Sequence, residues 1–355
     1  MIDRNRITYE DCNEANVSDL MKAINRIWVK GHVLSYDRLL LRWQYNSIFQ
    51  TDELNFVLAR ESSSDEIIGF MGFIHNSTFD QSLVQREDGY LWGALWKVQD
   101  DFLGMSIGKK LFQRMQSRIN APYAAFGIND EIAKLYNKMG FELGSMNQFF
   151  IANSSLTEYK LLGIKDSRQA FSAFAKRSRD YEYLLLHEKD LVDQARLIDD
   201  LSPTHIIPRK TVLYFINRYL RHPVYHYDIF AIYEHSQLKA LLVTRRCYAE
   251  NRKAIRVIDF IGEEDQIKNI ADLLFRQIED TGAEYADFIN FGIDEQVFID
   301  AGFKKVAYDD EAEIVPNYYE PFIRKNVLLR FACEKMQKNK MWLFKGDSDQ
   351  DRPNL

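Results

Sequence analysis

The chain has 355 residues, of which 46% are hydrophobic and 14% aromatic. This composition excludes a disordered chain, and the length favours two domains of about 150 residues each. The formal net charge of -6 argues against a surface that follows the phosphates of a nucleic acid, so we expect no nucleic-acid partner.

Apolar residues at helical spacing predict two helices near the N-terminus, over 18–30 and 36–45. Three strands rich in branched and aromatic residues follow, over 54–61, 67–75 and 89–98. The predicted order then continues with a helix over 106–119, a strand over 122–128, a helix over 129–138 and strands near 141 and 148.

The second half of the chain repeats this order of elements. It is predicted to contain a strand (182–188), two helices (189–201 and 209–222), three strands (227–233, 238–247 and 254–261), a helix (265–281), a strand (283–293) and a short helix before "AGF". Because the same order over two long segments rarely arises by chance, we interpret the chain as a tandem duplication with an α+β fold. The predicted domains are 1–155 and 181–355, joined by a linker over 156–180.

The N-terminus is charged from its third residue and carries no apolar signal segment. No run of about eighteen apolar residues occurs anywhere, so we expect a cytoplasmic protein without a membrane partner. The three cysteines, Cys12, Cys247 and Cys333, are scattered without CxxC spacing, and the seven histidines form no HxxxH pair on a helix. The sequence therefore predicts no metal site.

The stretch "QDDFLGMSIGKKLFQRM" (99–115) joins the third predicted strand to the next helix. Unpaired N–H groups and a partial positive charge at the start of a helix attract an anion, and small residues let the backbone approach it. Gly104, Ser106 and Gly108 supply small residues here. The alternative is that the two glycines only shape a turn.

The order of elements and this loop resemble the GNAT superfamily of acyl-CoA N-acyltransferases, in which the loop binds the pyrophosphate of coenzyme A. The resemblance implies an acyl-CoA site in which the preceding strand holds the pantetheine arm. Leu103 and Ser106 depart from the usual Q/R-x-x-G-x-G/A pattern, which removes one cationic contact. The cofactor-binding residues that it implies are Trp96, Lys97, Val98, Leu103, Gly104, Met105, Ser106, Ile107, Gly108, Lys109 and Asn129.

The passage "FGINDEIAKLYNKMGF" (126–141) also matches the superfamily, which commonly has Asn, Ala, Tyr and Gly-Phe in this order. The resemblance implies that Tyr136 is the general acid that protonates the departing thiolate. A phenol with a pKa of about 10 and a thiol with one of about 8.5 make this transfer nearly balanced. The alternative is that the Tyr136 ring packs under the sheet while its hydroxyl reaches solvent. No carboxylate lies between Leu91 and Val98, so a general base that some members place there is missing.

The second half carries a shortened copy, "FGIDEQVFIDAGF" (291–303), in which Phe298 stands where Tyr136 stands in the first. Aligning the helices sets Ala271 against Gly108 and Asp272 against Lys109. A carboxylate at this place repels a diphosphate, and a bulkier residue blocks its approach. We therefore expect a degenerate second GNAT-like domain with an acceptor-binding or structural role.

The phrases "PNYYEPF" (316–322) and "FKGDSDQDRPN" (344–354) look like those of tandem GNAT nucleotide-sugar N-acyltransferases of bacterial O-antigen and capsule biosynthesis. This resemblance implies transfer of an acetyl or 3-hydroxybutanoyl group from acyl-CoA by direct attack in a ternary complex. The implied acceptor is the amino group of a dTDP-linked 3-amino-3,6-dideoxyhexose, such as dTDP-3-amino-fucose. Implied sugar-site residues are Asp347, Asp349, Arg352 and Tyr318; the alternative is that the acidic end is an exposed, frayed tail.

Two other functions stay open at this point. Aminoacyl-tRNA-dependent peptide-bridge ligases also pair two GNAT-like halves, but they need a basic surface for tRNA, which the net charge disfavours. A non-catalytic coenzyme A-binding protein would bind the cofactor and release no thiol with any amine.

Overall fold

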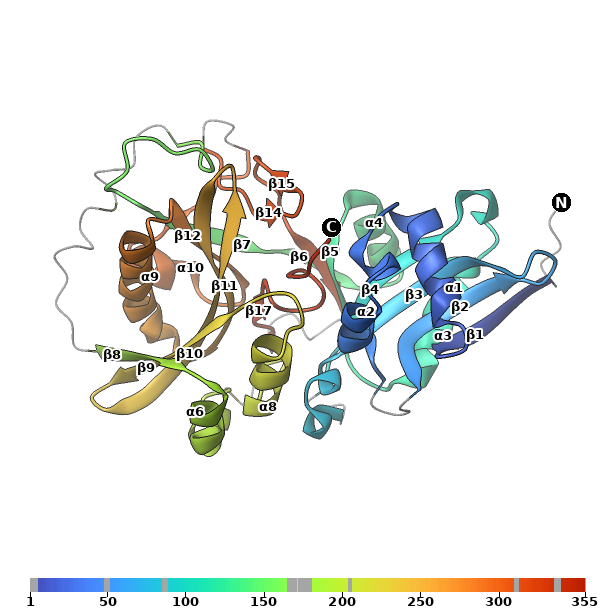
Figure 1. Cartoon of the computed structure of the whole chain (residues 1–355), viewed down its shortest axis with the longest axis horizontal. Coiled ribbons are helices and arrows are strands. Elements are labelled where there is room, and N and C mark those ends of the chain that lie inside the picture. The colour runs from blue at the N-terminus through green and yellow to red at the C-terminus, as the bar shows by residue number, and fades with distance from the viewer. Residues whose placement is uncertain are drawn as a thin grey trace.

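Two mixed β-sheets lie next to each other in the computed structural model, each with its own helices (Figure 1). The structure describes residues 6–47, 52–84, 89–164, 171, 181–203, 206–309, 313–334 and 340–354. Most of the predicted linker 156–180 lies outside these ranges. No helix within them is long and apolar enough to cross a membrane.

The first sheet has the strand order β1-β2-β3-β4-β5-β16-β6. Of these strands, only β4 and β5 pair in parallel; all other neighbours in the sheet are antiparallel. The strands are β1 (Ile7–Asn13), β2 (Glu53–Glu61), β3 (Glu66–His75), β4 (Leu91–Val98), β5 (Tyr123–Ile128), β16 (Arg330–Cys333) and β6 (Glu142–Ser145).

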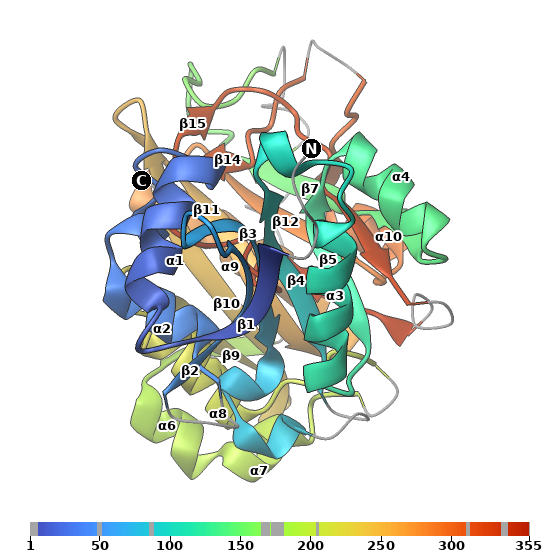
Figure 2. The ribbon, with the colours of Figure 1, turned by 90° about the vertical axis from the view of Figure 1, so that its right-hand side faces the viewer.

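Helices cover both faces of this sheet, as Figure 2 shows. The helices α1 (Val17–Ala23) and α2 (Arg38–Tyr45) lie on one face, and α3 (Ile107–Arg118) and α4 (Asp130–Lys138) lie on the other. Successive side chains of a strand point to opposite faces, so Phe70 of β3 joins the core under α1 and α2, whereas Met71 joins the core under α3.

The second sheet has the order β13-β7-β12-β11-β10-β9-β8, and β17 (Leu343–Phe344) pairs with β12 outside this path. Its only parallel pair among the described strands is β11 with β12. The strands are β13 (Lys304–Lys305), β7 (Asn147–Ala152), β12 (Tyr285–Phe291), β11 (Arg252–Gly262), β10 (Gln237–Ala249), β9 (Asp228–Glu234) and β8 (Tyr181–Leu186).

The long helix α9 (Ile267–Thr281) and the short helix α10 (Glu295–Ala301) cover one face of the second sheet, packed on a core of aromatic and branched side chains. Further short elements complete the fold. They are α6 (Glu188–Asp193), α7 (Ala195–Asp199), α8 (Val212–Phe215), the π-helical turns at Ile24–Trp28 and Ile216–Leu220, and the hairpin β14 (Tyr318–Tyr319) with β15 (Phe322–Ile323).

The two halves exchange strands. β7 follows β6 directly in the chain but lies in the second sheet, where Phe149 pairs with Phe288 of β12. In return, β16 comes from near the C-terminus and inserts between β5 and β6 of the first sheet. The boundary near residue 155 that the sequence suggests therefore falls after the chain has already entered the second sheet.

Candidate active site

The two parallel strands of the first sheet separate part of the way along. β4 and β5 pair at Leu91 with Tyr123, at Trp92 with Ala124 and at Gly93 with Ala125, and no pair follows in this fully described stretch. On its other edge β4 stays paired with β3 as far as Val98. The backbone of 94–98 thus faces an opening on the β5 side, where an extended chain can add to the edge of β4.

The loop after β4 turns sharply into α3. Gly104 and Ser106 both adopt left-handed backbone conformations, with φ of 82° and 63°. The side chain of Ser106, at the N-cap, makes no hydrogen bond to the helix, and the first turn carries no acidic residue. The first N–H groups of α3 therefore keep their hydrogen-bonding capacity and their partial positive charge for an anion.

A pocket of about 610 Å³ lies between the end of β4, this loop and the start of α4. It is lined by eight of the predicted cofactor-binding residues, namely Trp96, Lys97, Val98, Leu103, Gly104, Ser106, Ile107 and Gly108. The other lining residues are Asp100, Phe102, Glu131, Ile132 and Leu135. The structure thus brings most of the predicted acyl-CoA residues together around one opening.

Three predicted cofactor residues lie elsewhere. The Asn129 side chain accepts a hydrogen bond from the Ile132 N–H at 2.9 Å, so it caps α4. Met105 packs against the core beneath α3, and Lys109 is exposed on that helix. Lys97, which does line the pocket, forms a 2.8 Å ion pair with Asp100 across the pocket wall.

Aromatic rings form the inner wall of this pocket. The Trp96 ring stacks on Phe112, with centroids 5.7 Å apart. A Cβ atom added at Gly108 would lie 3.4 Å from the Trp96 ring, an ordinary contact distance. Gly108 therefore leaves the helix backbone open to the pocket, and a single methyl group at this position fits without strain.

Tyr136 lies behind this wall and not on it. Its side chain is 2% exposed, its ring centroid is 6.1 Å from that of Trp96, and its hydroxyl lies 2.5 Å from the hydroxyl of Tyr123. Burial raises the pKa of Tyr136, and the hydrogen bond with Tyr123 offsets only part of this rise. The ring packs in the core, but its hydroxyl meets Tyr123 and not solvent, and Tyr136 is a weaker acid in this conformation than a free phenol.

In the second half, the chain's own C-terminal segment fills the corresponding opening. β11 and β12 pair only from Ile255 to Val257, and beyond this point β12 pairs with β17. The Gly346 N–H then donates to the Ile258 carbonyl of β11 at 2.7 Å. β17 thus occupies the place between the parallel strands that stays open in the first half, which the sequence did not predict.

The structure also shows the environment of the residues by which the second copy departs from the predicted coenzyme A site. α9 begins at Ile267, so Ala271 lies inside the helix, where the first copy has its loop and helix start. Asp272 is buried and pairs with Arg276 at 2.7 Å. Phe298 is also buried, and its ring stacks on Phe149 with centroids 4.2 Å apart.

The acidic C-terminal segment is folded, so the frayed-tail alternative is wrong. Asp347 is 0% exposed and lies 3.0 Å from Lys210, and Asp351 is bound to Arg245 at 2.7 Å. Asp349 pairs with Arg352. These buried carboxylates stay inside the protein because each has a cationic partner.

Two of the predicted sugar-site residues meet at a small cavity lined by residues of the second half of the chain. Arg352 and Tyr318 line a space of about 20 Å³ with Lys345, Gln350 and residues of the second sheet. Asp347 and Asp349 do not line it. Sequence reasoning missed Lys345, although it stands within the phrase that carried the prediction.

A second pocket between the halves was not predicted. It has a volume of about 480 Å³ and is lined mainly by polar residues: Asn46, Ser47, Ser77, Thr78, Asp80, Gln81 and Asn217, with Phe79 and Leu213. The polar run at 76–82, set between two strongly apolar strands, was a signal in the sequence that could have indicated it.

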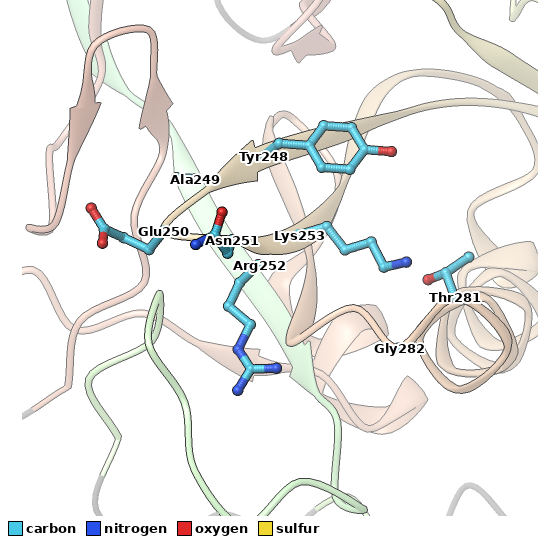
Figure 3. Close-up of a pocket in the computed structure, with 8 residues that line it drawn as sticks. All are labelled: Tyr248, Ala249, Glu250, Asn251, Arg252, Lys253, Thr281 and Gly282. Atoms are coloured by element: carbon cyan, nitrogen blue, oxygen red, sulfur yellow. The ribbon is translucent and has the colours of Figure 1, made fainter.

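A shallow groove of about 680 Å³ lies far from these residues, at the tip of the β10–β11 hairpin (Figure 3). The side chains of Tyr248 and Lys253 extend along it toward Thr281 and Gly282 at the end of α9, whereas Glu250 points away. None of the predicted site residues lines this groove. Within the described ranges, no group of three His, Cys, Asp or Glu side chains is placed to hold a metal ion.

No protein-family model matches the chain, and no curated protein sequence matches it. Solved structures do. A GCN5-related N-acetyltransferase from Anabaena variabilis has a TM-score of 0.55 at 11% identity, over 92% of this chain and 72% of that one. The chain has a GNAT-like fold. This confirms the predicted fold class.

Two further structures share the fold. Saccharomyces cerevisiae N-myristoyltransferase with bound myristoyl-CoA has a TM-score of 0.51 at 10% identity, over 94% of this chain and 80% of that one. A GCN5-related glucosamine N-acetyltransferase region of a fungal multi-domain β-N-acetylglucosaminidase has a TM-score of 0.55 at 10% identity, over 92% of this chain and 38% of that one. At such identities the likeness establishes the fold alone.

Proposed function

We propose that the chain is an acyl-CoA-dependent N-acyltransferase that binds the thioester in its first half. The observation that carries the proposal is the difference between the two openings. The first, between β4 and β5, adjoins an uncapped helix start, whereas the second contains β17. The GNAT-like fold supports the same reaction class, and one protein of this fold was solved with bound myristoyl-CoA.

The residues around the first opening fit a coenzyme A thioester. Gly104 and Gly108 leave room for a diphosphate beside the first N–H groups of α3. The free edge of β4 offers backbone groups to the amide-containing pantetheine arm, as it would to an added strand. When bound, the thioester supplies the activated acyl group.

The acceptor that we propose is the amino group of a dTDP-linked 3-amino-3,6-dideoxyhexose. The resemblance of 316–322 and 344–354 to nucleotide-sugar N-acyltransferases supports this choice. The same two segments also meet in the structure, since Tyr318 and Arg352 line one small cavity. In this mechanism the amine attacks the thioester directly, backbone N–H groups of β4 stabilise the developing oxyanion, and Tyr136 donates the proton that the sulfur takes.

The proposal is tested by thiol release from acetyl-CoA and 3-hydroxybutanoyl-CoA in the presence of dTDP-3-amino-3,6-dideoxyhexoses. The matched control is the corresponding dTDP-6-deoxyhexose, which carries a hydroxyl in place of the amine. We expect thiol release with the amino sugar and none with the control. Coenzyme A binding without release for any amine would instead indicate a non-catalytic binding protein.

A further inference from the structure

Lys345 is a buried lysine without a hydrogen-bond partner. The residue is 2% exposed, and its Nζ makes no hydrogen bond to any described residue. Burying an amine in this way costs free energy, because the group loses its water and gains no partner. Such a group calls for a reason beyond packing.

The charged groups around Lys345 are already paired with one another. On the second sheet, Arg245 of β10 binds Asp351 through two hydrogen bonds of 3.0 and 2.7 Å. Arg256 of β11 binds Asp287 of β12 in the same way, at 3.0 and 2.8 Å. The carboxylates of Asp351 and Asp287 are thus shared with guanidinium groups.

The remaining neighbours complete the surroundings. Tyr318 places its ring under the amine, with Nζ 4.8 Å from the ring centroid. Tyr225, Glu320 and Arg352 line the same cavity. Glu320 interacts with the Tyr225 hydroxyl, and Arg352 pairs with Asp349.

This environment favours the neutral form of the lysine. Burial lowers the pKa of Lys345 to about 7, and the charge of Arg256 contributes in the same direction. An ordinary lysine has a pKa of about 10.4 and cannot accept a proton at neutral pH. Here the amine is free to accept one near pH 7.

The cavity lies against the strand that borders the first opening. Gln350 lines the cavity, and its Nε2 donates to the carbonyl of Phe126 on β5 at 3.2 Å. Phe126 directly follows Ala125, the last residue of β5 that pairs with β4. The short segment from Lys345 to Gln350 therefore connects the buried amine with the place where β4 and β5 separate.

The size of the cavity decides whether the Lys345 amine binds an anion or exchanges a proton with a water molecule. A volume of about 20 Å³ holds one water molecule. It does not hold a phosphate group or a sugar ring, so an anion-binding role is disfavoured. A water molecule next to a neutral amine can carry a proton.

We propose that Lys345 is the proton acceptor of the acyl transfer, reached from the acceptor's ammonium group through one water molecule in this cavity. This inference rests on the proposed function. An N–H bond of the ammonium breaks, and its proton passes through the water to Nζ. The freed lone pair forms the C–N bond as the C–S bond breaks. Tyr136 protonates the sulfur and regains the second proton of the nitrogen, and Lys345 later releases its proton to solvent.

The test is the dependence of kcat/KM on pH for the wild type and for Lys345→Met, with Lys345→Gln measured beside it. For the wild type we expect a rise through pH 7. For Lys345→Met we expect a loss of about tenfold or more at pH 7 that shrinks to within about threefold at pH 9, where the acceptor amine begins to deprotonate itself. A purely structural role would lower activity equally at all pH values.

A second readout does not depend on activity. In protein labelled with ¹³C at lysine Cε, we expect one signal that titrates near pH 7 and is missing in Lys345→Met. Parallel pH profiles for wild type and variant, or no lysine signal that titrates below pH 9, would overturn the inference alone. Absence of thiol release by the wild type would overturn the proposed function, and the inference with it.

Discussion

The hydroxyl groups of Tyr123 and Tyr136 form a 2.5 Å hydrogen bond beneath the point where β4 and β5 separate. Gly93, the last residue of β4 that pairs with β5, has no room for a side chain, because an added Cβ would lie 1.9 Å from the Tyr123 hydroxyl. The hydroxyl pair thus lies directly against the point where the strands part, separated from the pocket by Trp96.

If Tyr136 donates the proton to the sulfur, Tyr136→Phe should lower kcat by about 100-fold. The dissociation constant of coenzyme A should change less than twofold, because Tyr136 does not line the pocket. Stopped-flow thiol release and isothermal titration calorimetry measure the two quantities. Tyr123→Phe is the matched control, since it removes the partner but keeps the Tyr136 hydroxyl, and it should lose less. A Tyr136→Phe enzyme with turnover within twofold of the wild type would rule out this proton donor.

Gly108→Asp should weaken coenzyme A binding by at least about tenfold, because it places a carboxylate where we expect the diphosphate. An aspartate in the first turn favours the helix itself, so the variant should fold. Gly108→Ala is the control: its methyl group fits at 3.4 Å from Trp96 and adds no charge. Calorimetry should show a clearly smaller loss of affinity for Gly108→Ala than for Gly108→Asp, and one site per chain for the wild type. Equal affinities for the two variants would place the diphosphate elsewhere.

Asp351→Asn should lower the free energy of unfolding by about 3 kcal/mol at pH 7, since it leaves the buried Arg245 without its carboxylate. Burial raises the pKa of Asp351, but Arg245 outweighs this effect and brings it to about 2. A lowered folded-state pKa stabilises the fold above pH 4, and this contribution is lost as the pH falls through 2.

Urea unfolding between pH 7 and pH 2 should therefore show the difference between wild type and Asp351→Asn shrinking below pH 4. Glu188→Gln is the control, because Glu188 pairs with Arg221 at an exposed site. We expect a change within about 0.5 kcal/mol for it. If the two proteins differ in free energy of unfolding by the same amount at all pH values, the ion pair between Arg245 and Asp351 is not the cause of the difference.

Lys345→Met should stabilise the protein at neutral pH, because it removes an unpaired buried amine. The folded-state pKa of about 7 lies below the unfolded one, so the unfolded chain binds more protons between pH 7 and about pH 10. The penalty is therefore full below pH 7 and fades as the pH rises.

We expect the gain from Lys345→Met to be at least about 1 kcal/mol larger at pH 6.5 than at pH 9.5, measured by urea unfolding. Lys22→Met, at an exposed site, should show no such dependence. A variant that is less stable than the wild type at pH 6.5 would show that the amine has a structural role.

Much of the first site could be predicted because its signals are local. The turn into α3 needs small residues at fixed spacing, and Gly104, Ser106 and Gly108 stand in 11 consecutive described residues with Val98. The depth of Tyr136 was not predictable in this way. It depends on Trp96 and Tyr123, which lie far from it in the chain and meet it only in the packed core.

The burial of the C-terminal segment could not be predicted for the same reason. Its sequence is acidic and hydrophilic, which is typical of an exposed end. It is buried because Lys210 and Arg245, more than 100 residues earlier, neutralise Asp347 and Asp351. The exchange of β7 and β16 could not be predicted either. The alternation of side chains along each of these strands suits both sheets.

That exchange has a consequence for how the protein is made. The first sheet lacks the strand between β5 and β6 until Arg330–Cys333 has left the ribosome, so β5 keeps an unpaired edge until then. The proposed thioester site lies beside this edge. It therefore reaches its final form only after residues 330–333 have been synthesised, and a fragment released earlier would expose β5 to aggregation.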